Sequence, residues 1–310
     1  MDESTLPQLS DDLVFLSDGG LETTLVFRDG VDLPEFAAFP LLDSAEGRSR
    51  MAAYFTPYFD LAERLGTGFV LDTPTWRANL DWGHRLGYDA PALVEVNERA
   101  VGYVAELAGT RPSLRTVLNG VVGPRGDGYI VNALMTADEA ADYHALQVDA
   151  FAASGAQMVS ALTMTYAAEA IGVVRAAGAA AIPVVVSFTV ETDGRLPSGQ
   201  QLAKAVVEVD EATDGAAAYF MVNCAHPTHF LSVLEGDGWL DRVKGIRANS
   251  STKSHAELDQ ATELDRGDIP GLARGYGELS RVLPDLRVVG GCCGTDDAHV
   301  AAIARELVPG

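Results

Sequence analysis

The sequence predicts a single (β/α)8 TIM barrel, a one-domain α/β fold in which eight parallel strands alternate with helices. Three observations support this prediction. Eight short apolar runs recur along the 310 residues, each is followed by a helix or an interval long enough for one, and no proline- or glycine-rich linker divides the chain. A doubly wound open sheet is the alternative, because it uses the same alternation of strands and helices.

The predicted strands are apolar over nearly their whole length, as in a parallel sheet that is covered on both faces. In chain order they are residues 13–18, 68–73, 115–122, 157–163, 183–189, 217–223, 244–249 and 287–291. Residues 1–12 are expected to form an acidic N-terminal tail, and residues 13–310 the barrel domain.

The intervals between the strands carry typical helix ends. Thr136 with Glu139 three residues later predicts an N-terminal capping box, and Gly66 and Gly155 are typical of residues that follow a helix. Two longer intervals, residues 25–44 and 250–271, are predicted to be extended loops. On a barrel, such loops commonly act as lids or as subunit contacts.

Composition argues against several classes of function. The 44 acidic residues outnumber the 22 basic ones and give a formal charge of -22, which argues against a nucleic-acid partner. No apolar stretch approaches the roughly 18 residues that a membrane helix needs, and the acidic start is unlike a signal peptide. We therefore expect a cytoplasmic protein that binds small molecules rather than nucleic acid or membranes; the sequence does not decide whether it forms a homo-oligomer.

All three cysteines of the chain fall at predicted strand ends. Cys224 follows the sixth strand, and Cys292 and Cys293 follow the eighth. Because the carboxyl ends of barrel strands form one rim, the three thiols are expected to converge. Three thiolates with an open fourth position are typical of a reactive zinc site. The alternatives are three unconnected apolar cysteines, or a redox pair at the adjacent cysteines, which lacks the usual CxxC spacing.

Other polar residues of this rim have more than one interpretation. Asp18 ends the first predicted strand and either caps a turn or holds the ammonium group of a ligand. His226 lies two residues after Cys224 and is either an ordinary loop residue or a fourth metal ligand. His299, on the last predicted helix, is expected to face solvent or a neighbouring turn.

Three motifs together resemble the homocysteine S-methyltransferase family. They are DGGLETTL at residues 18–25, NC followed by a proline at residues 223–227, and VVGGCCGT at residues 288–295. The family includes the betaine– and S-methylmethionine–homocysteine methyltransferases and the homocysteine module of methionine synthase. The resemblance extends over residues 13–307.

The resemblance implies a transferase that makes methionine by zinc-dependent transfer of a methyl group to homocysteine. Its substrates would be homocysteine and a small donor, namely S-methylmethionine, S-adenosylmethionine or betaine. It implies Zn2+ at Cys224, Cys292 and Cys293. The substrate-binding residues implied or expected at the same rim are Asp18, Gly19, Gly20, Asn223 and Gly291.

The chemistry of that reaction fits the residues. A free thiol has a pKa of about 8.5, and coordination to zinc deprotonates it, so no separate catalytic acid or base is expected. Thr75 and Trp76, followed by Arg77, come after the second strand and are candidates for a donor pocket. The face of Trp76 would attract a sulfonium or quaternary ammonium by about 0.5 to 2 kcal/mol, although a core tryptophan is the more ordinary interpretation.

One position departs from the family pattern. Many members carry a glutamate at the end of the fourth strand that binds the amino group of homocysteine, and the corresponding stretch here, ALTMTYAAEA, has Met164 at the expected place. Glu169, one turn later, either substitutes for this glutamate or caps or decorates the next helix, and the second interpretation is favoured. The alternatives are therefore methyl transfer to a different thiol and a non-catalytic barrel that binds zinc and a thiol.

Overall fold

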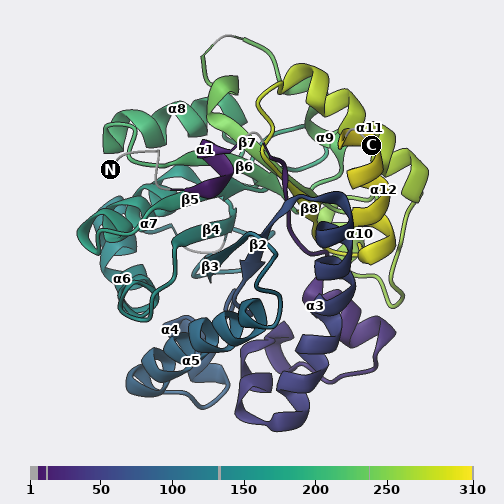
Figure 1. The fold of residues 1–310 in the computed structure, drawn as a ribbon. Helices are drawn as coiled ribbons and strands as arrows, with labels where there is room; N and C mark the ends of the chain where they lie inside the picture. The colour runs from purple at the N-terminus through teal and green to yellow at the C-terminus, as the bar shows by residue number, and fades with distance from the viewer. Residues whose placement is uncertain (1–5, 12, 132–133, 237, 309–310) are drawn as a thin grey trace.

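The computed structural model describes residues 6–11, 13–131, 134–236 and 238–308, and it confirms the predicted fold. Eight parallel strands form a closed barrel in the order β1-β2-β3-β4-β5-β6-β7-β8, with helices around it (Figure 1). The strands are β1 (Phe15–Leu16), β2 (Gly68–Asp72), β3 (Thr116–Val122), β4 (Met158–Met164), β5 (Val184–Phe188), β6 (Tyr219–Asn223), β7 (Val243–Ala248) and β8 (Val288–Gly291). Closure occurs at β1, where Phe15 pairs with Gly68 of β2 and Val288 of β8.

The outer layer contains long helices between the strands and short helical turns in the loops. The longer helices are α3 (Ala45–Leu65), α5 (Ala90–Gly109), α6 (Ala137–Ala153), α7 (Ala167–Ala179), α8 (Leu202–Thr213), α11 (Ile269–Val282) and α12 (Asp297–Leu307). The shorter ones are α1 (Pro7–Ser10), α2 (Leu21–Thr23), α4 (Leu80–Arg85), α9 (Pro227–Phe230) and α10 (His255–Asp259), with the turns η2 (Thr24–Arg28), η3 (Pro34–Phe36), η4 (Phe39–Asp43), η5 (Leu231–Val233) and η6 (Leu240–Arg242). In the described part of the chain, no helix combines the length and the apolar character that crossing a membrane requires.

Local sequence signals explain several helix ends. The predicted capping box at the start of α6 is present, with the Thr136 hydroxyl accepting from the Glu139 N–H and the Glu139 carboxylate accepting from the Thr136 N–H. Gly66 ends α3 in the left-handed conformation (φ 66°), which glycine adopts without steric cost. Of the two long intervals, residues 25–44 contain most of η2 and all of η3 and η4, and residues 250–271 contain α10 and the start of α11.

The acidic tail includes a short helix that closes the N-terminal end of the barrel. Leu6 is buried and belongs to a core cluster with residues at the start of the strands, among them Phe15 and Val185. In α1 (Figure 1), the fully buried Gln8 donates to the Tyr219 hydroxyl at 3.2 Å and to the Met158 sulfur at 3.1 Å. The opposite, C-terminal end of the barrel is left for the cavity.

Substitution of Leu6 tests this closure. We expect Leu6→Ala to lower the free energy of unfolding by about 2 to 4 kcal/mol, because it removes a side chain that is 2 % exposed and leaves a cavity under the barrel. Leu13→Ala is the matched control. Because Leu13 is 37 % exposed, its substitution should lower the free energy of unfolding much less. Urea unfolding of both variants measures the difference, and equal losses would contradict a packing role for the tail.

Candidate active site

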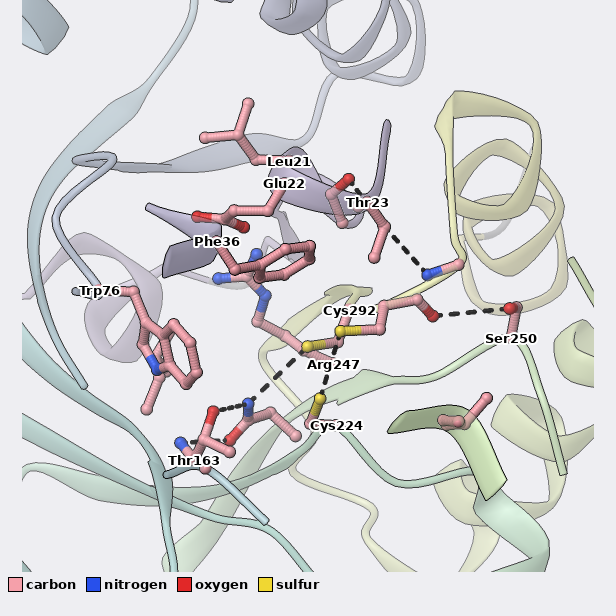
Figure 2. A pocket seen from close by; sticks show the side chains of 18 of the residues that line it. Leu21, Glu22, Thr23, Phe36, Trp76, Thr163, Cys224, Arg247, Ser250 and Cys292 are labelled. Atoms are coloured by element: carbon pink, nitrogen blue, oxygen red, sulfur yellow. Dashed lines mark hydrogen bonds between the residues drawn. The ribbon is translucent and has the colours of Figure 1, made fainter. Parts of the chain in front are cut away.

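A cavity of about 390 Å³ lies among the C-terminal ends of the strands. Its volume is in the range of small-molecule sites, near the lower end. Figure 2 shows the side chains that face it from the strand ends and from the loop after β1. The strand-end residues in its lining are Asp18, Asp72, Leu162, Thr163, Asn223, Cys224, Arg247, Cys292 and Cys293. Both long loops contribute to its walls, with Phe27 and Phe36 from one and Leu258 from the other.

The structure brings the three cysteines together in this lining. Their sulfur atoms all lie within 4.8 Å of one another, and the sulfurs of Cys224 and Cys293 are 3.6 Å apart. Cys224 comes directly after β6, and Cys292 and Cys293 directly after β8. The convergence therefore arises from strand ends that lie on the same rim, although 68 residues separate Cys224 from Cys292 in the chain.

The three thiols differ in their tendency to ionise. Hydrogen bonds from Cys224 and Cys293, aided by the positive charge of Arg247, hold the pKa of Cys292 well below its ordinary value. The pKa of Cys293 is raised by its hydrogen bonds with Cys224 and Cys292, by burial and by repulsion from their negative charge, and that of Cys224 is also raised. Without a cation, the cluster therefore favours one thiolate and two thiols.

Two non-glycine residues with left-handed backbone shape the site. Thr163 has φ 62° and Cys224 has φ 57°, conformations that are uncommon for residues with a side chain and most unusual for a β-branched one. Asn223 holds both strand ends in place. Its carbonyl oxygen accepts from the Thr163 N–H at 2.9 Å and the Ser187 hydroxyl at 2.6 Å, and its amide donates to the Thr163 hydroxyl at 2.9 Å. Asn223 is thus engaged by the protein, with its amide 3.9 Å from the Cys292 sulfur.

Tyr129 lies beside the sulfur cluster. Its hydroxyl is 3.1 Å from the Cys224 sulfur and donates to the Cys293 sulfur at 3.6 Å. Its ring stacks on His255 with centroids 4.0 Å apart, and His255 is held by the Glu191 carboxylate at 3.0 Å. The sequence analysis did not identify Tyr129 as a site residue. Tyr129 lies in the glycine-rich interval after β3, and this interval was the sequence feature that could have indicated it.

A buried ion cluster forms the floor on the other side. Arg247 contacts the carboxylates of Asp18 and Asp72, and its Nε donates to the Gly291 carbonyl oxygen at 3.2 Å. The second oxygen of Asp18 accepts from the Tyr54 hydroxyl at 3.0 Å. Burial raises the pKa of Asp18 to about 7, against the opposing effect of Arg247. Asp18 lines the cavity as expected, but the protein already provides partners for both of its carboxylate oxygens.

The predicted glycines allow close contacts between backbone segments. A Cβ atom on Gly20 would lie 2.7 Å from the Cys292 carbonyl oxygen, so glycine lets the loop after β1 pack against the cysteine pair. Gly19 likewise approaches the Thr295 carbonyl, and Gly291 approaches the Thr295 side chain. Gly19 and Gly20 line the cavity, whereas Gly291 is outside its lining and its carbonyl oxygen accepts from Arg247.

Of the two residues predicted for a donor pocket, Thr75 and Trp76, one lines the cavity and the other does not. Trp76 lines the cavity (Figure 2), whereas Thr75 is fully buried and donates to the Val121 carbonyl oxygen at 2.8 Å. Arg77 also lines the cavity, and its guanidinium carbon lies 3.5 Å from the Trp82 ring centroid and 4.5 Å from that of Trp76. Burial lowers the pKa of Arg77 to about 10.

The side chain that β4 presents to the cavity is Leu162, which corrects the expectation for Met164. Met164 is fully buried in the hydrophobic core, while Leu162 and Thr163 line the cavity. The reason is local: the left-handed Thr163 and a register shift between Ala161 and Met164 break the alternation of an ordinary strand. In either position the residue is apolar, so β4 supplies no carboxylate.

Three other polar residues lie outside the cavity lining. Glu169 is buried on α7, where it accepts from the Arg125 N–H at 2.7 Å and pairs with His144 at 3.0 Å. His226 caps α9, and burial lowers its pKa to about 4. His299 is buried rather than solvent-facing, and its Nε2 lies 2.8 Å from the Arg266 carbonyl oxygen in a neighbouring loop.

Glu22, in α2, is a cavity residue that the sequence analysis did not single out. Burial, together with the negative charges of Asp18 and Cys292, raises its pKa to about 7 against the opposing effects of its own backbone N–H and of Arg247. The signal was its position within the DGGLETTL motif, four residues after Asp18. The site therefore contains more acidic groups than the strand ends alone predict.

Comparisons with known proteins identify similar chains. The model of the family described as homocysteine S-methyltransferase matches residues 15–307. Crystal structures of the homocysteine methyltransferase MmuM from Escherichia coli are similar in fold, at 19 % identity over 96 % of this chain and 97 % of that one. The TM-score is 0.74 for the metallated and oxidised forms and 0.68 for the apo form. No curated protein matches the chain.

Removal of the buried guanidinium should destabilise the protein. Arg247→Met leaves the carboxylates of Asp18 and Asp72 buried without their cation, so we expect the free energy of unfolding to fall by about 3 to 5 kcal/mol. Arg274→Met is the control, because the Arg274 side chain is 67 % exposed and its ion pair should contribute little. Chemical denaturation measures both, and a loss below about 1 kcal/mol for Arg247→Met would contradict this account.

Glu22 should make stability depend on pH. Its pKa is raised from 4.5 to about 7 in the folded state, so folding binds protons between these values and stability falls as pH rises through this window. We expect Glu22→Gln to be more stable than the wild type at pH 8, by on the order of 1 to 2 kcal/mol, and to differ much less at pH 5.5. Urea unfolding of the metal-free protein at both pH values tests this, and a difference independent of pH would refute it.

Proposed function

The chain belongs to the homocysteine S-methyltransferase family, and we propose that it transfers a methyl group from a small cationic donor to the thiol of homocysteine, forming methionine. The observation that carries the proposal is the convergence of three cysteine sulfurs on one cavity. We propose further that Cys224, Cys292 and Cys293 hold Zn2+ there.

The donor set fits such an ion. Three sulfurs within 4.8 Å of one another match the soft ligands that zinc prefers, and a four-coordinate zinc ion held by them would have one position left for a substrate thiol. The raised pKa values of Cys224 and Cys293 reflect a cluster that cannot hold three negative charges by itself, and a divalent cation supplies the missing positive charge. When bound, zinc would keep the acceptor sulfur in its nucleophilic thiolate form.

The reaction would form a carbon–sulfur bond between the methyl group and the homocysteine sulfur. The bond from that methyl group to the sulfur or nitrogen of the donor breaks, and its electron pair stays on the donor atom. Such a displacement needs alignment of three atoms rather than proton transfer, so positioning is the main task of the protein. We propose that the loop residues Phe27, Phe36 and Leu258 exclude water from this space.

The donor would be S-methylmethionine, S-adenosylmethionine or betaine. Each carries a positive charge at the atom that bears the methyl group, and Trp76 offers an aromatic face to the cavity. The modest volume of about 390 Å³ favours the compact donors over S-adenosylmethionine.

A second candidate is methyl transfer to a thiol without an amino group. It is favoured by one observation, namely that β4 presents the apolar Leu162 to the cavity, whereas many family members carry a glutamate at the end of this strand.

Metal content and product formation test the proposal together. We expect about one zinc per chain in the anaerobically purified wild type, and loss of both zinc and methyl transfer in Cys292→Ser, because one of the three sulfurs is gone. Elemental analysis and methionine formation from each of the three donors are the measurements.

Met164→Leu is the matched control, since it removes a sulfur atom that lies in the core and not in the cavity. Its zinc content and activity should equal those of the wild type. A wild type without metal, or a Cys292→Ser variant that still forms methionine, would refute the zinc site.

A further inference from the structure

Homocysteine carries an α-ammonium group that requires a negative partner in a buried site. The end of β4 provides none, because Leu162 and Thr163 face the cavity there. Asp18 lines the cavity, but its two oxygens already accept from Arg247 and Tyr54, and it is only 3 % exposed. The ammonium partner must therefore come from another element.

Glu22 is a carboxylate in the cavity lining that has no hydrogen bond to another residue of the described part of the chain. Among the residues that the structure describes, only its own backbone N–H hydrogen-bonds to its carboxylate. In Figure 2 its side chain extends from the loop after β1 toward the side of the cavity on which Trp76 lies. Asp18 and Cys292 act electrostatically on Glu22 and together outweigh the opposing effect of Arg247, and this places Glu22 near the sulfur cluster. A cation of a ligand would relieve this accumulation of negative charge.

The chemistry of methyl transfer indicates which cation Glu22 should bind. The positive charge at the methyl-bearing atom of the donor disappears as the methyl group moves to the thiolate. A carboxylate beside that atom would stabilise the starting state more than the transition state and would slow the reaction. The α-ammonium group of the acceptor keeps its charge throughout, so a carboxylate can bind it without raising the barrier.

We propose that Glu22 binds the α-ammonium group of the acceptor amino acid and thereby selects homocysteine over thiols that lack this group. The inference rests on the function proposed above and assigns a specificity-determining role to a residue in the loop after β1. In this arrangement the carboxylate that β4 lacks is supplied by α2, and Leu162 adds only apolar surface.

Direct binding of two thiols tests the proposal. L-Homocysteine and 4-sulfanylbutanoate share the thiol, the carbon chain and the carboxylate, and only homocysteine has the ammonium group. Each is titrated calorimetrically into the zinc-loaded protein without a methyl donor. We expect the wild type to bind homocysteine more tightly by about 10- to 100-fold, as for a hydrogen bond between charged groups.

Glu22→Gln should weaken homocysteine binding by about the same 10- to 100-fold and leave 4-sulfanylbutanoate unchanged or more tightly bound. Glu263→Gln is the matched control, because Glu263 is an exposed carboxylate at the same cavity and should alter neither affinity. Thermal unfolding of both variants verifies that they are folded.

The other outcomes separate the two proposals. Unchanged homocysteine affinity in Glu22→Gln, or an equal loss for both thiols, would overturn the role of Glu22 while leaving methyl transfer intact. A zinc-loaded wild type that binds neither thiol and forms no methionine would overturn the proposed function and this inference together.

Discussion

The guanidinium of Arg247 holds together the strand ends on which the cavity is built. From β7 it contacts Asp18 after β1 and Asp72 at the end of β2, and it donates to the carbonyl oxygen of Gly291 in β8. A buried cation between two carboxylates is stable only while all three groups are present. This cluster fixes the floor of the site and engages Asp18, and in our proposal Glu22 is the carboxylate that binds a cation of the ligand.

Asn223 has a comparable role for the sulfur cluster. Its side chain bonds to β4 through Thr163 and to β5 through Ser187, directly before Cys224 leaves β6 with left-handed backbone. Unfavourable backbone conformations of this kind persist where the surrounding structure enforces them, and they concentrate at functional sites. On β4 a second distortion, the left-handed Thr163 with its register shift, accompanies the placement of Leu162 rather than Met164 in the cavity lining.

The charged residues of the cavity suit a reaction between a positively charged methyl donor and a negatively charged thiolate. The cationic side chains in the described lining of the cavity are Arg247 and Arg77. The groups that can carry negative charge there are the three cysteines and Asp18, Glu22, Asp72, Asp127, Asp259, Glu263 and Asp265. This excess of acidic groups favours a divalent metal ion and positively charged substrate groups. In our proposal the metal ion balances the negative charge of the cysteine sulfurs. Glu22 binds the α-ammonium group of homocysteine, which keeps its charge during the reaction. The aromatic face of Trp76 contacts the positively charged group of the donor, which loses its charge when the methyl group is transferred.

The sequence by itself determined the barrel, the capping box of α6 and the expectation that the cysteines meet. These features follow from local patterns, because apolar runs define strands and the ends of parallel strands share one rim. The tertiary structure decided which side chains of the site contact one another. Asp18 and Arg247 are 229 residues apart in the sequence, and Tyr129 and Cys293 are 164 residues apart. No local sequence pattern specifies a contact over such separations. The tertiary structure also decided which side chain of β4 faces the cavity, because the left-handed Thr163 interrupts the alternation from which such a prediction is made.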